Sequence, residues 1–312
     1  MSRLLSDKPK CIVIVSTKSS GSSALQELLC GFGGGRHVQH TRHGEFETLY
    51  WTKAASILGL PQVKLPDSEV PIPPDRALLD LRTILTENAA GFELPTDHDR
   101  LIFDGWRALC HAHAPVFVEK SPHHLHQWSC LTLMIKAVNA MPEIDFRFVG
   151  LVRNPMDALY SAWTRWRVPP EVFQKHWRTA YENLERLRET IGDRLVIVRY
   201  EDFSSTRQTA SKLLASLGLP SVRHGADDYI HGAARNRWKA DHGFGFQLDG
   251  AVAELAIRYG YLSQDLVNGR QLAWPLRRML LQTVHHCFSR PVAIARRELR
   301  QLAGRLHHRE SH

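Results

Sequence analysis

The sequence predicts an α/β protein in which a parallel sheet is flanked by helices. The first observation is the β-branched run from Ile12 to Val15, which is typical of a buried parallel strand. The second is that similar strand-like runs alternate with segments whose apolar residues recur at helical spacing. Strands that alternate with helices in this way build a parallel sheet that is covered on both faces.

The strand and helix predictions follow the chain in order. After the first strand, Leu25, Leu28 and Leu29 fall on one face of a predicted helix. Further strands are predicted at 37–40, 116–120, 146–153 and 194–200. Further helices are predicted at 125–138, 156–167, 171–191 and 206–217.

Two regions fall outside this alternation. Residues 44–115 contain the proline cluster EVPIPPD and several short helical patterns, so we expect a helical insertion that covers the ligand-binding site. The main domain is then expected to span 1–270. Residues 271–312 are predicted to form a basic helical C-terminal extension, because eight arginines stand against two glutamates from Trp274 onward.

The charge of the whole chain favours anionic ligands. Its formal net charge is +8, which suits phosphorylated ligands or acidic surfaces. The C-terminal helix either packs its apolar side on the domain, which we favour, or lies on a membrane surface. Nucleic-acid binding is not expected, because the basic tail has no interleaved aromatic residues and no recognised module.

The cysteines and the N-terminal segment indicate the cellular compartment in which the protein is expected. Five widely spaced cysteines without a C-x-x-C pair fit a reducing environment better than a disulfide scaffold. The segment MSRLLSDKPK has no apolar core of a signal peptide, and no apolar run approaches the ~18 residues of a membrane span. We therefore expect a cytoplasmic protein, with peripheral membrane contact as the alternative.

The turn after the first strand has the chemistry of an anion site. Ser16 to Ser23 contains five serines, a threonine, a glycine and Lys18, and it leads into a helix. Small polar residues at a helix N-terminus present N–H and O–H donors to phosphate or sulfate. No G-x-x-x-x-G-K-[ST] motif occurs, so ordinary ATP or GTP hydrolysis lacks its usual parts.

A second motif, VRNPMDALYSAW, follows the strand predicted at 146–153. Arg153 closes that strand, and Ser161 lies eight residues further along the following helix. An arginine can hold a phosphate bidentately, and a serine two turns along can donate to the same group. Because ligands bind beyond the carboxyl ends of parallel strands, both motifs are expected at one edge of the sheet.

Together these motifs resemble the sulfotransferases that use 3′-phosphoadenosine-5′-phosphosulfate (PAPS), which have a P-loop-like fold. VEKSP (118–122) and RYEDF (199–203) also look like landmarks of that family, in the family's order. The resemblance implies that the serine-rich loop holds the phosphosulfate and that the arginine–serine pair binds the 3′-phosphate. The donor-binding residues it implies are Lys18, Ser19, Ser20, Gly21, Ser22, Ser23, Arg153, Ser161 and, from a late basic loop, Arg235, Arg237 and Lys239.

One position departs from the family pattern. The family often has lysine or arginine two residues before the loop glycine, whereas this chain has Ser19 there and Lys18 one residue earlier. The Lys18 side chain either reaches the oxygen that bridges the phosphate and the sulfate of PAPS, or points away from it. Lys120 is the natural substitute, because a lysine in a similar element helps stabilise the transferring group in tyrosylprotein-type members.

Transfer to a hydroxyl also requires a general base. The segment HVQHTRHGEFE offers His40, His43, Glu45 and Glu47, and QHTR resembles the Glu-Glu-Thr-Arg of tyrosylprotein-type enzymes. We predict His40 as the base, because an ordinary histidine titrates near neutral pH, with Glu45 next. No metal site is expected at His123, His124 and His126, since no cysteine or carboxylate completes a tetrahedral set.

The sequence hypothesis is therefore a PAPS-dependent O-sulfotransferase. Its acceptor is expected to be a hydroxyl of a sugar, a lipid-linked molecule or another natural product. The alternatives are a protein that binds PAPS or its product PAP without catalysis, and a kinase-like phosphotransferase.

Overall fold

The core of the protein is a parallel sheet of four strands. The computed structural model describes residues 8–65, 68–220, 235–269, 273–285, 287 and 291. The strands are β1 (Lys10–Ser16), β2 (Val116–Lys120), β3 (Asp145–Val152) and β4 (Leu195–Arg199), in the spatial order β2-β1-β3-β4. Every neighbouring pair is parallel. The predicted α/β class and its parallel sheet are thereby confirmed.

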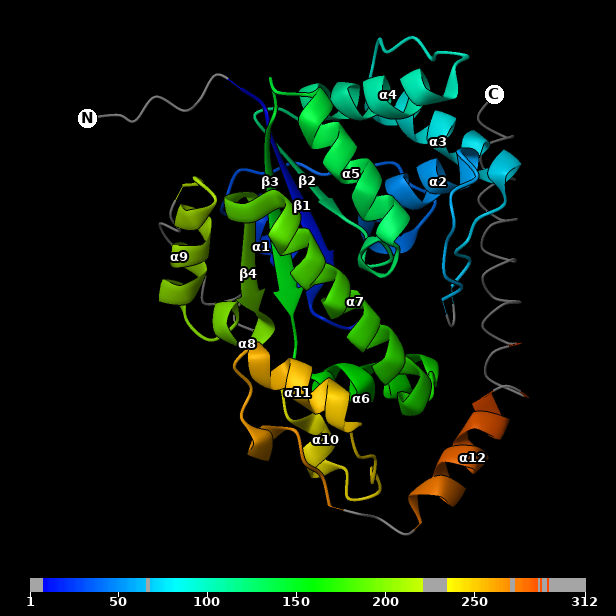
Figure 1. The fold of residues 1–312 in the computed structure, drawn as a ribbon, viewed down its shortest axis with the longest axis vertical. Helices are drawn as coiled ribbons and strands as arrows, with labels where there is room; N and C mark the ends of the chain where they lie inside the picture. Colours follow the sequence, from blue (N-terminus) through cyan, green and yellow to red (C-terminus); the bar gives the residue numbers. More distant parts are fainter. Residues whose placement is uncertain are drawn as a thin grey trace, which may run out of the picture.

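Alternate residues of β1 face two different hydrophobic cores. Ile12 and Ile14 pack in a cluster with α1 (Ser22–Gly31) and α9 (Arg207–Ser216). Cys11, Val13 and Val15 belong to the larger core on the other face, with α5 (Trp128–Ala140) and α7 (Pro170–Ile191). Figure 1 shows α7 crossing the sheet and α9 to the left of β4. A strand covered on both faces explains the uninterrupted apolar run in the sequence.

The insertion between α1 and β2 is helical. It contains α2 (Tyr50–Ile57), α3 (Pro74–Asn88) and α4 (His98–Ala112), which gather beside α5 at one side of the sheet (Figure 1). Trp51 and Trp106 pack with Tyr50 and Phe117 in a contiguous aromatic cluster. This cluster joins the insertion to β2.

Five further α-helices complete the described part of the chain. Those not yet described are α6 (Pro155–Trp166), α8 (Tyr200–Phe203), α10 (Arg237–Ala240), α11 (Gly250–Arg258) and α12 (Trp274–Val284). Within the described residues, no helix has both the length and the apolar character needed to span a bilayer.

The prediction of a strand at 37–40 is wrong. Only Arg36 bridges to Phe117 of β2, and the chain then leaves the sheet. The backbone amides of Gln39 and His40 instead donate to the Asn88 side chain on α3, at 3.0 and 3.1 Å. Because α3 takes these donors, no strand ladder continues beyond Arg36.

The C-terminal helix packs on the domain with only part of its apolar residues, since Trp274 is buried and Leu281 packs against the larger core. Arg277 and Arg278 of α12 pair with Asp241 and Glu171 on the body of the protein, each at 2.8 Å. The exposed side carries Leu276, Met279, Leu280 and Val284. The ion pairs hold Arg277 and Arg278 against the domain, and these four apolar side chains remain on the outer side. Apart from residues 273–285, 287 and 291, the predicted extension at 271–312 lies outside the described residues.

A buried carboxylate ties the insertion to the end of β2. Glu119 Oε1 accepts hydrogen bonds from Thr48 Oγ1 at 2.9 Å and Ser121 Oγ at 2.6 Å. Its Oε2 lies 3.6 Å from His124 Nδ1, while His124 Nε2 accepts the Trp51 amide. Burial alone would raise the pKa of Glu119, but His124, Ser121 and Thr48 outweigh it and hold that pKa below its usual value.

We predict that Glu119→Ala lowers the free energy of unfolding by about 3–5 kcal/mol, because several buried donors lose their acceptor at once. Urea unfolding followed by circular dichroism measures this loss. Glu143→Ala is the control, since the Glu143 side chain is 43% exposed and pairs with Arg107 in a partly exposed ion pair of the kind that contributes about 0–1 kcal/mol. Equal losses for both variants would contradict the role assigned to Glu119.

Candidate functional site

The carboxyl ends of the four strands converge on one edge of the sheet. Ser16 ends β1 beside Leu151 of β3, Ile14 pairs with Lys120 at the end of β2, and Val152 pairs with Arg199 at the end of β4. The loop that follows β1 therefore lies between the ends of β2 and β3. This is the edge at which parallel α/β sheets bind ligands.

The backbone of the serine-rich loop has a conformation that only some residue types adopt readily. Ser19 has φ +64° and Gly21 has φ +86°, in the left-handed region that favours glycine. A Cβ on Gly21 would lie 2.3 Å from the Tyr200 ring, so this position also requires glycine for space. Gly21 is followed directly by α1, which begins at Ser22.

Side chains on both sides hold the loop in this shape. Ser20 is buried, and its Oγ donates to the Thr17 carbonyl at 2.8 Å and lies 3.4 Å from Tyr181 Oη. Arg153 donates to the Ser19 carbonyl at 2.7 Å, and its guanidinium lies 4.7 Å from the centre of the Tyr200 ring. The structure thus brings together the loop and the arginine that the sequence had singled out separately.

Lys120 occupies the other side of the loop, with no exposed surface. Its Nζ lies 3.3 Å from Ser23 Oγ at the start of α1, 3.4 Å from Glu47 Oε1 and 3.5 Å from Glu45 Oε2. Ser23 Oγ also donates to Glu45 Oε2 at 2.6 Å. We call Lys120, Ser23, Glu45 and Glu47 the transfer cluster.

The two carboxylates of the transfer cluster differ in basicity. The pKa of Glu45 is lowered, because Ser23, Lys120 and Arg165 together outweigh its partial burial. The pKa of Glu47 is raised, chiefly by burial and further by the negative charge of Glu45, against the opposing charge of Lys120. Glu47 is therefore the better proton acceptor of the two near neutral pH.

The predicted late basic loop lies beyond the ends of β3 and β4. Arg235 donates to the Glu201 carbonyl at 2.6 Å and to Ser204 Oγ at 2.7 Å, while Lys239 pairs with Asp265 at 3.2 Å. Arg237 is exposed at the start of α10. Ser161 lies half-buried on α6, the helix that begins directly after Asn154.

A cavity of about 430 Å³ adjoins this loop. Its walls include Asn154, Asp157, Glu201, Arg235 and Tyr261. Glu201 fixes two of these walls, because its carboxylate accepts the Asn154 amide at 3.0 Å and the Tyr261 hydroxyl at 2.7 Å. A volume of this size lies within the range of ligand sites.

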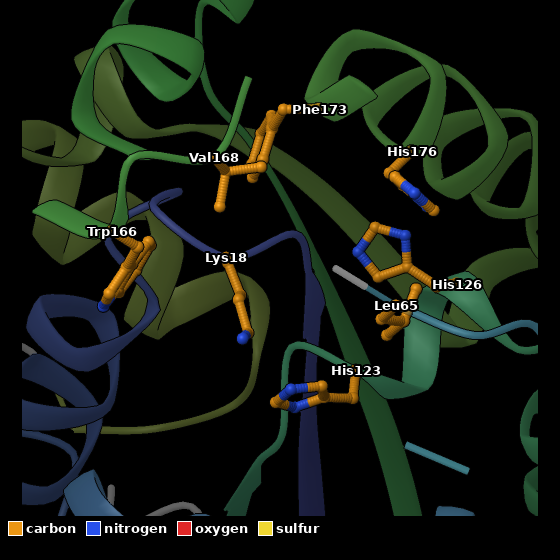
Figure 2. Close-up of a pocket in the computed structure, with 8 residues that line it drawn as sticks. All are labelled: Lys18, Leu65, His123, His126, Trp166, Val168, Phe173 and His176. Atoms are coloured by element: carbon orange, nitrogen blue, oxygen red, sulfur yellow. The ribbon is translucent and has the colours of Figure 1, made fainter. Parts of the chain in front are cut away.

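The Lys18 side chain leaves the loop beside Trp166, at the end of α6. Its Nζ lies 5.6 Å from the centre of the Trp166 ring, and the side chain enters a narrow hollow between α6, α7 and the segment after β2 (Figure 2). Leu65, Trp166, Val168 and Phe173 form its apolar walls. His123, His126 and His176 complete it. We call this the Lys18 hollow.

His40 lies apart from these groups. It is exposed and lines a different cavity of about 410 Å³, together with Arg42, Lys53 and Asp80. Its backbone is held by Asn88, whose Nδ2 donates to the His40 carbonyl at 2.7 Å. Of the candidate bases in the sequence segment, the structure brings Glu45 and Glu47 to Lys120.

The remaining histidines near the site do not form a metal centre in the described part of the chain. No group of three or more His, Cys, Asp or Glu side chains there is arranged to hold a metal ion. His123 Nδ1 instead lies 3.6 Å from Glu47 Oε2.

Comparison with known proteins identifies the family. The family model described as Sulfotransferase family matches residues 9–223, which is more than half of the chain. The protein belongs to the sulfotransferase family, and its parallel sheet with flanking helices agrees with the sulfotransferase P-loop-like fold. No curated protein matches the chain.

Sequence reasoning missed several residues of the site. Glu119 was given no role beyond its place in the VEKSP motif, whereas its carboxylate accepts hydrogen bonds from Thr48 and Ser121. Trp166, Phe173 and His176 carry no motif that separates them from ordinary helix residues. Only their position at the carboxyl edge of the sheet, on elements that follow β3, could have indicated them.

Asp157 generates a prediction on the pH dependence of stability. Burial raises its pKa from 3.8 to about 6, and Glu201 adds to this rise, although Arg153 lowers it. The folded state therefore binds a proton more tightly than the unfolded state, and stability falls as the pH rises from about 4 to 6. Above pH 6 the charged carboxylate costs the folded protein about 3 kcal/mol.

Asp157→Asn should therefore raise the melting temperature at pH 7.5, and this gain should shrink at pH 5. Differential scanning calorimetry at both pH values measures the difference. Asp193→Asn, at an exposed position, serves as the control and should change little at either pH. A gain for Asp157→Asn that does not depend on pH would refute the assignment.

Proposed function

We propose that this sulfotransferase uses PAPS as its donor and transfers the sulfuryl group to a hydroxyl of an organic acceptor. The observation that carries the proposal is the transfer cluster, in which Lys120 and Ser23 at the start of α1 face two carboxylates. Cationic and hydroxyl donors suit the transferring group, and a carboxylate suits the hydroxyl that attacks it.

The donor is proposed to lie along the carboxyl edge of the sheet. Its phosphosulfate is assigned to the loop from Lys18 to Ser23, where amides and hydroxyls at the start of α1 offer hydrogen bonds to an anion. Arg153, which also bonds the Ser19 carbonyl, is assigned with Ser161 to the 3′-phosphate. Arg235, Arg237 and Lys239 add positive charge on the side of the 430 Å³ cavity.

Lys120 is proposed to stabilise the leaving oxygen. In the transfer, the bond between sulfur and the bridging oxygen of the donor breaks, and a bond between sulfur and the acceptor oxygen forms. The electron pair stays on the bridging oxygen, where a buried ammonium is most effective because little water screens it. Lys18 points into the Lys18 hollow, which favours Lys120 for this role.

Glu47 is proposed as the base that takes the proton of the acceptor hydroxyl. Its pKa is raised, mainly by burial, and it lies beside Lys120. Glu45 already accepts from Ser23 and Arg165, so we assign it to holding the cluster together. His40 lines another cavity, and we therefore move the base from His40 to Glu47.

The protein is proposed to act in the cytoplasm. The basis is its cysteine usage, with a membrane surface as an alternative contact through the C-terminal helix. The exposed apolar face of α12 is compatible with such a contact.

Arg153→Ala is expected to weaken PAP binding about 10- to 100-fold, because a charge-assisted phosphate contact is lost. Isothermal titration calorimetry without metal measures the affinity, with ATP and ADP as competing nucleotides. Arg147→Ala is the matched control on the same strand, since Arg147 pairs only with Asp145 at the far end of β3 in the described contacts. Unchanged PAP affinity in Arg153→Ala would remove this residue from the site.

Glu47→Gln is expected to lower turnover about 10²–10⁴-fold while PAP affinity stays near that of the wild type. In the wild-type protein, turnover should rise with pH through the raised pKa of Glu47, because the base must be deprotonated. This rise of turnover with pH should be absent in Glu47→Gln. Initial rates with PAPS from pH 4.5 to 8 measure both effects.

His40→Ala is the comparison for this experiment and should keep near-normal turnover. The assignment of the base fails if His40→Ala loses activity and Glu47→Gln does not. PAP binding without turnover on any hydroxyl compound would favour the non-catalytic alternative.

A further inference from the structure

The Glu45 carboxylate is bound by groups of the kind that hold a sulfuryl group. Its Oε2 accepts a hydrogen bond from Ser23 Oγ at 2.6 Å and lies 3.5 Å from Lys120 Nζ, while its Oε1 accepts from Arg165 at 3.1 Å. A sulfuryl group is also an anion whose oxygens accept from hydroxyl and cationic donors. Ser23 and Lys120, which the proposed function assigns to the phosphosulfate of PAPS, thus already bind a carboxylate of the chain.

Lys120 is covered by this contact. Its side chain has no exposed surface, and its Nζ is surrounded by Ser23 at 3.3 Å, Glu47 at 3.4 Å and Glu45 at 3.5 Å. One of these groups must move before an atom of PAPS can touch Lys120. Of the two carboxylates, the Glu45 side chain is 47% exposed and that of Glu47 is 17% exposed. Glu45 can therefore turn into water with less loss of buried contact than Glu47.

The charges of the transfer cluster and Arg165 already balance. Lys120 and Arg165 are positive, while Glu45 and Glu47 are negative when both are ionised. A sulfuryl group that joined all four would face two carboxylates in a partly buried place, where like charges repel more strongly than in water. Departure of Glu45 leaves an excess of positive charge at Lys120, and an anionic sulfuryl group can then replace the carboxylate.

The turn Gly44–Phe46, which carries Glu45, has a strained backbone. Glu45 and Phe46 both have φ +57°, in the left-handed region that residues other than glycine adopt at a cost. No residue of this turn is buried, and its one described internal hydrogen bond runs from the Glu47 amide to the first carbonyl of the turn at 3.3 Å. The Thr41 hydroxyl separately holds the Glu47 carbonyl at 2.6 Å. The turn can therefore rearrange while Glu47 stays in place.

We propose that the Glu45 carboxylate occupies the place of the transferring sulfuryl group and leaves that place when PAPS binds. This inference rests on the proposed function, because it gives a residue of the same site a further role. As PAPS binds, the contacts of Glu45 with Ser23 and Lys120 pass to the oxygens of the sulfuryl group. PAP has no sulfuryl group, so it binds without displacing Glu45. Glu45 is thus a specificity-determining residue that lowers the affinity for PAPS relative to PAP.

PAPS and PAP differ only in the sulfuryl group, so their affinities for the full chain test the proposal. Isothermal titration calorimetry is run at pH 7.5 without acceptor. Glu45→Gln keeps the shape of the side chain but removes its charge, so it competes less for Lys120 and no longer repels the incoming anion. We expect the ratio of the PAPS affinity to the PAP affinity to rise at least about tenfold over that of the wild type.

Glu182→Gln is the matched control. The Glu182 side chain is also 47% exposed and pairs with an arginine, Arg178, at 2.7 Å on α7. This variant loses the same charge without touching the transfer cluster, so the ratio should stay within about twofold of the wild type. Glu45→Ala is a second test, because it removes the competing acceptor altogether. It should raise the ratio by at least as much as Glu45→Gln.

The outcomes separate this inference from the proposed function. An unchanged or lower ratio in Glu45→Gln, with PAP still bound, overturns the inference and leaves the donor assignment standing. A ratio that rises equally in Glu182→Gln also overturns it, since general loss of negative charge would then be the cause. If neither PAP nor PAPS binds to the wild type or to the Glu45 variants, the donor assignment is rejected and this inference with it. A ratio raised in both Glu45 variants alone supports both.

Discussion

The buried carboxylate of Glu119 is the constraint on which the site depends. It stands at the end of β2, one residue before Lys120, and binds Thr48 at the start of the helical insertion. Ser121, on its other side, accepts the Leu49 amide at 3.0 Å. These bonds fix the chain just after Glu45 and Glu47 against the strand that carries Lys120. Other contacts add to this anchor: the Thr41 hydroxyl donates to the Glu47 carbonyl at 2.6 Å, and Glu45 accepts from Ser23 and Arg165.

The anchored cluster also sets the electrostatics of the edge. Lys120 has no exposed surface, so its charge is stabilised by the carboxylates that surround it and not by water. Glu45 shares its charge among Ser23, Lys120 and Arg165, while burial leaves Glu47 more basic. One lysine and two carboxylates thus acquire different roles from their surroundings alone. On the other side of the loop, Arg153 holds the Ser19 carbonyl, so both candidate cationic contacts are positioned before a ligand arrives.

Much of the fold could be predicted because its signals are local. The strands β2, β3 and β4 and the helices α6, α7 and α9 agree with the predicted segments to within one or two residues. The strand expected at 37–40 failed because Asn88, far away in the sequence, takes the backbone donors of Gln39 and His40. The loop and Arg153 could be predicted as site residues from their positions at strand ends. The proposed base, Glu47, could not be predicted, because His40, Glu45 and Glu47 lie within eight residues of one another.

The sequence by itself determined the class of the fold, the loop at the start of α1 and membership of the sulfotransferase family, which rest on short motifs and on periodicity. The tertiary structure decided which lysine faces the carboxylates and which carboxylate is buried enough to be basic. It also decided that Lys18 enters an apolar hollow with Trp166 and Phe173. The physical reason is that burial, pKa and pairing depend on neighbours brought together from distant segments, and no local pattern specifies those neighbours.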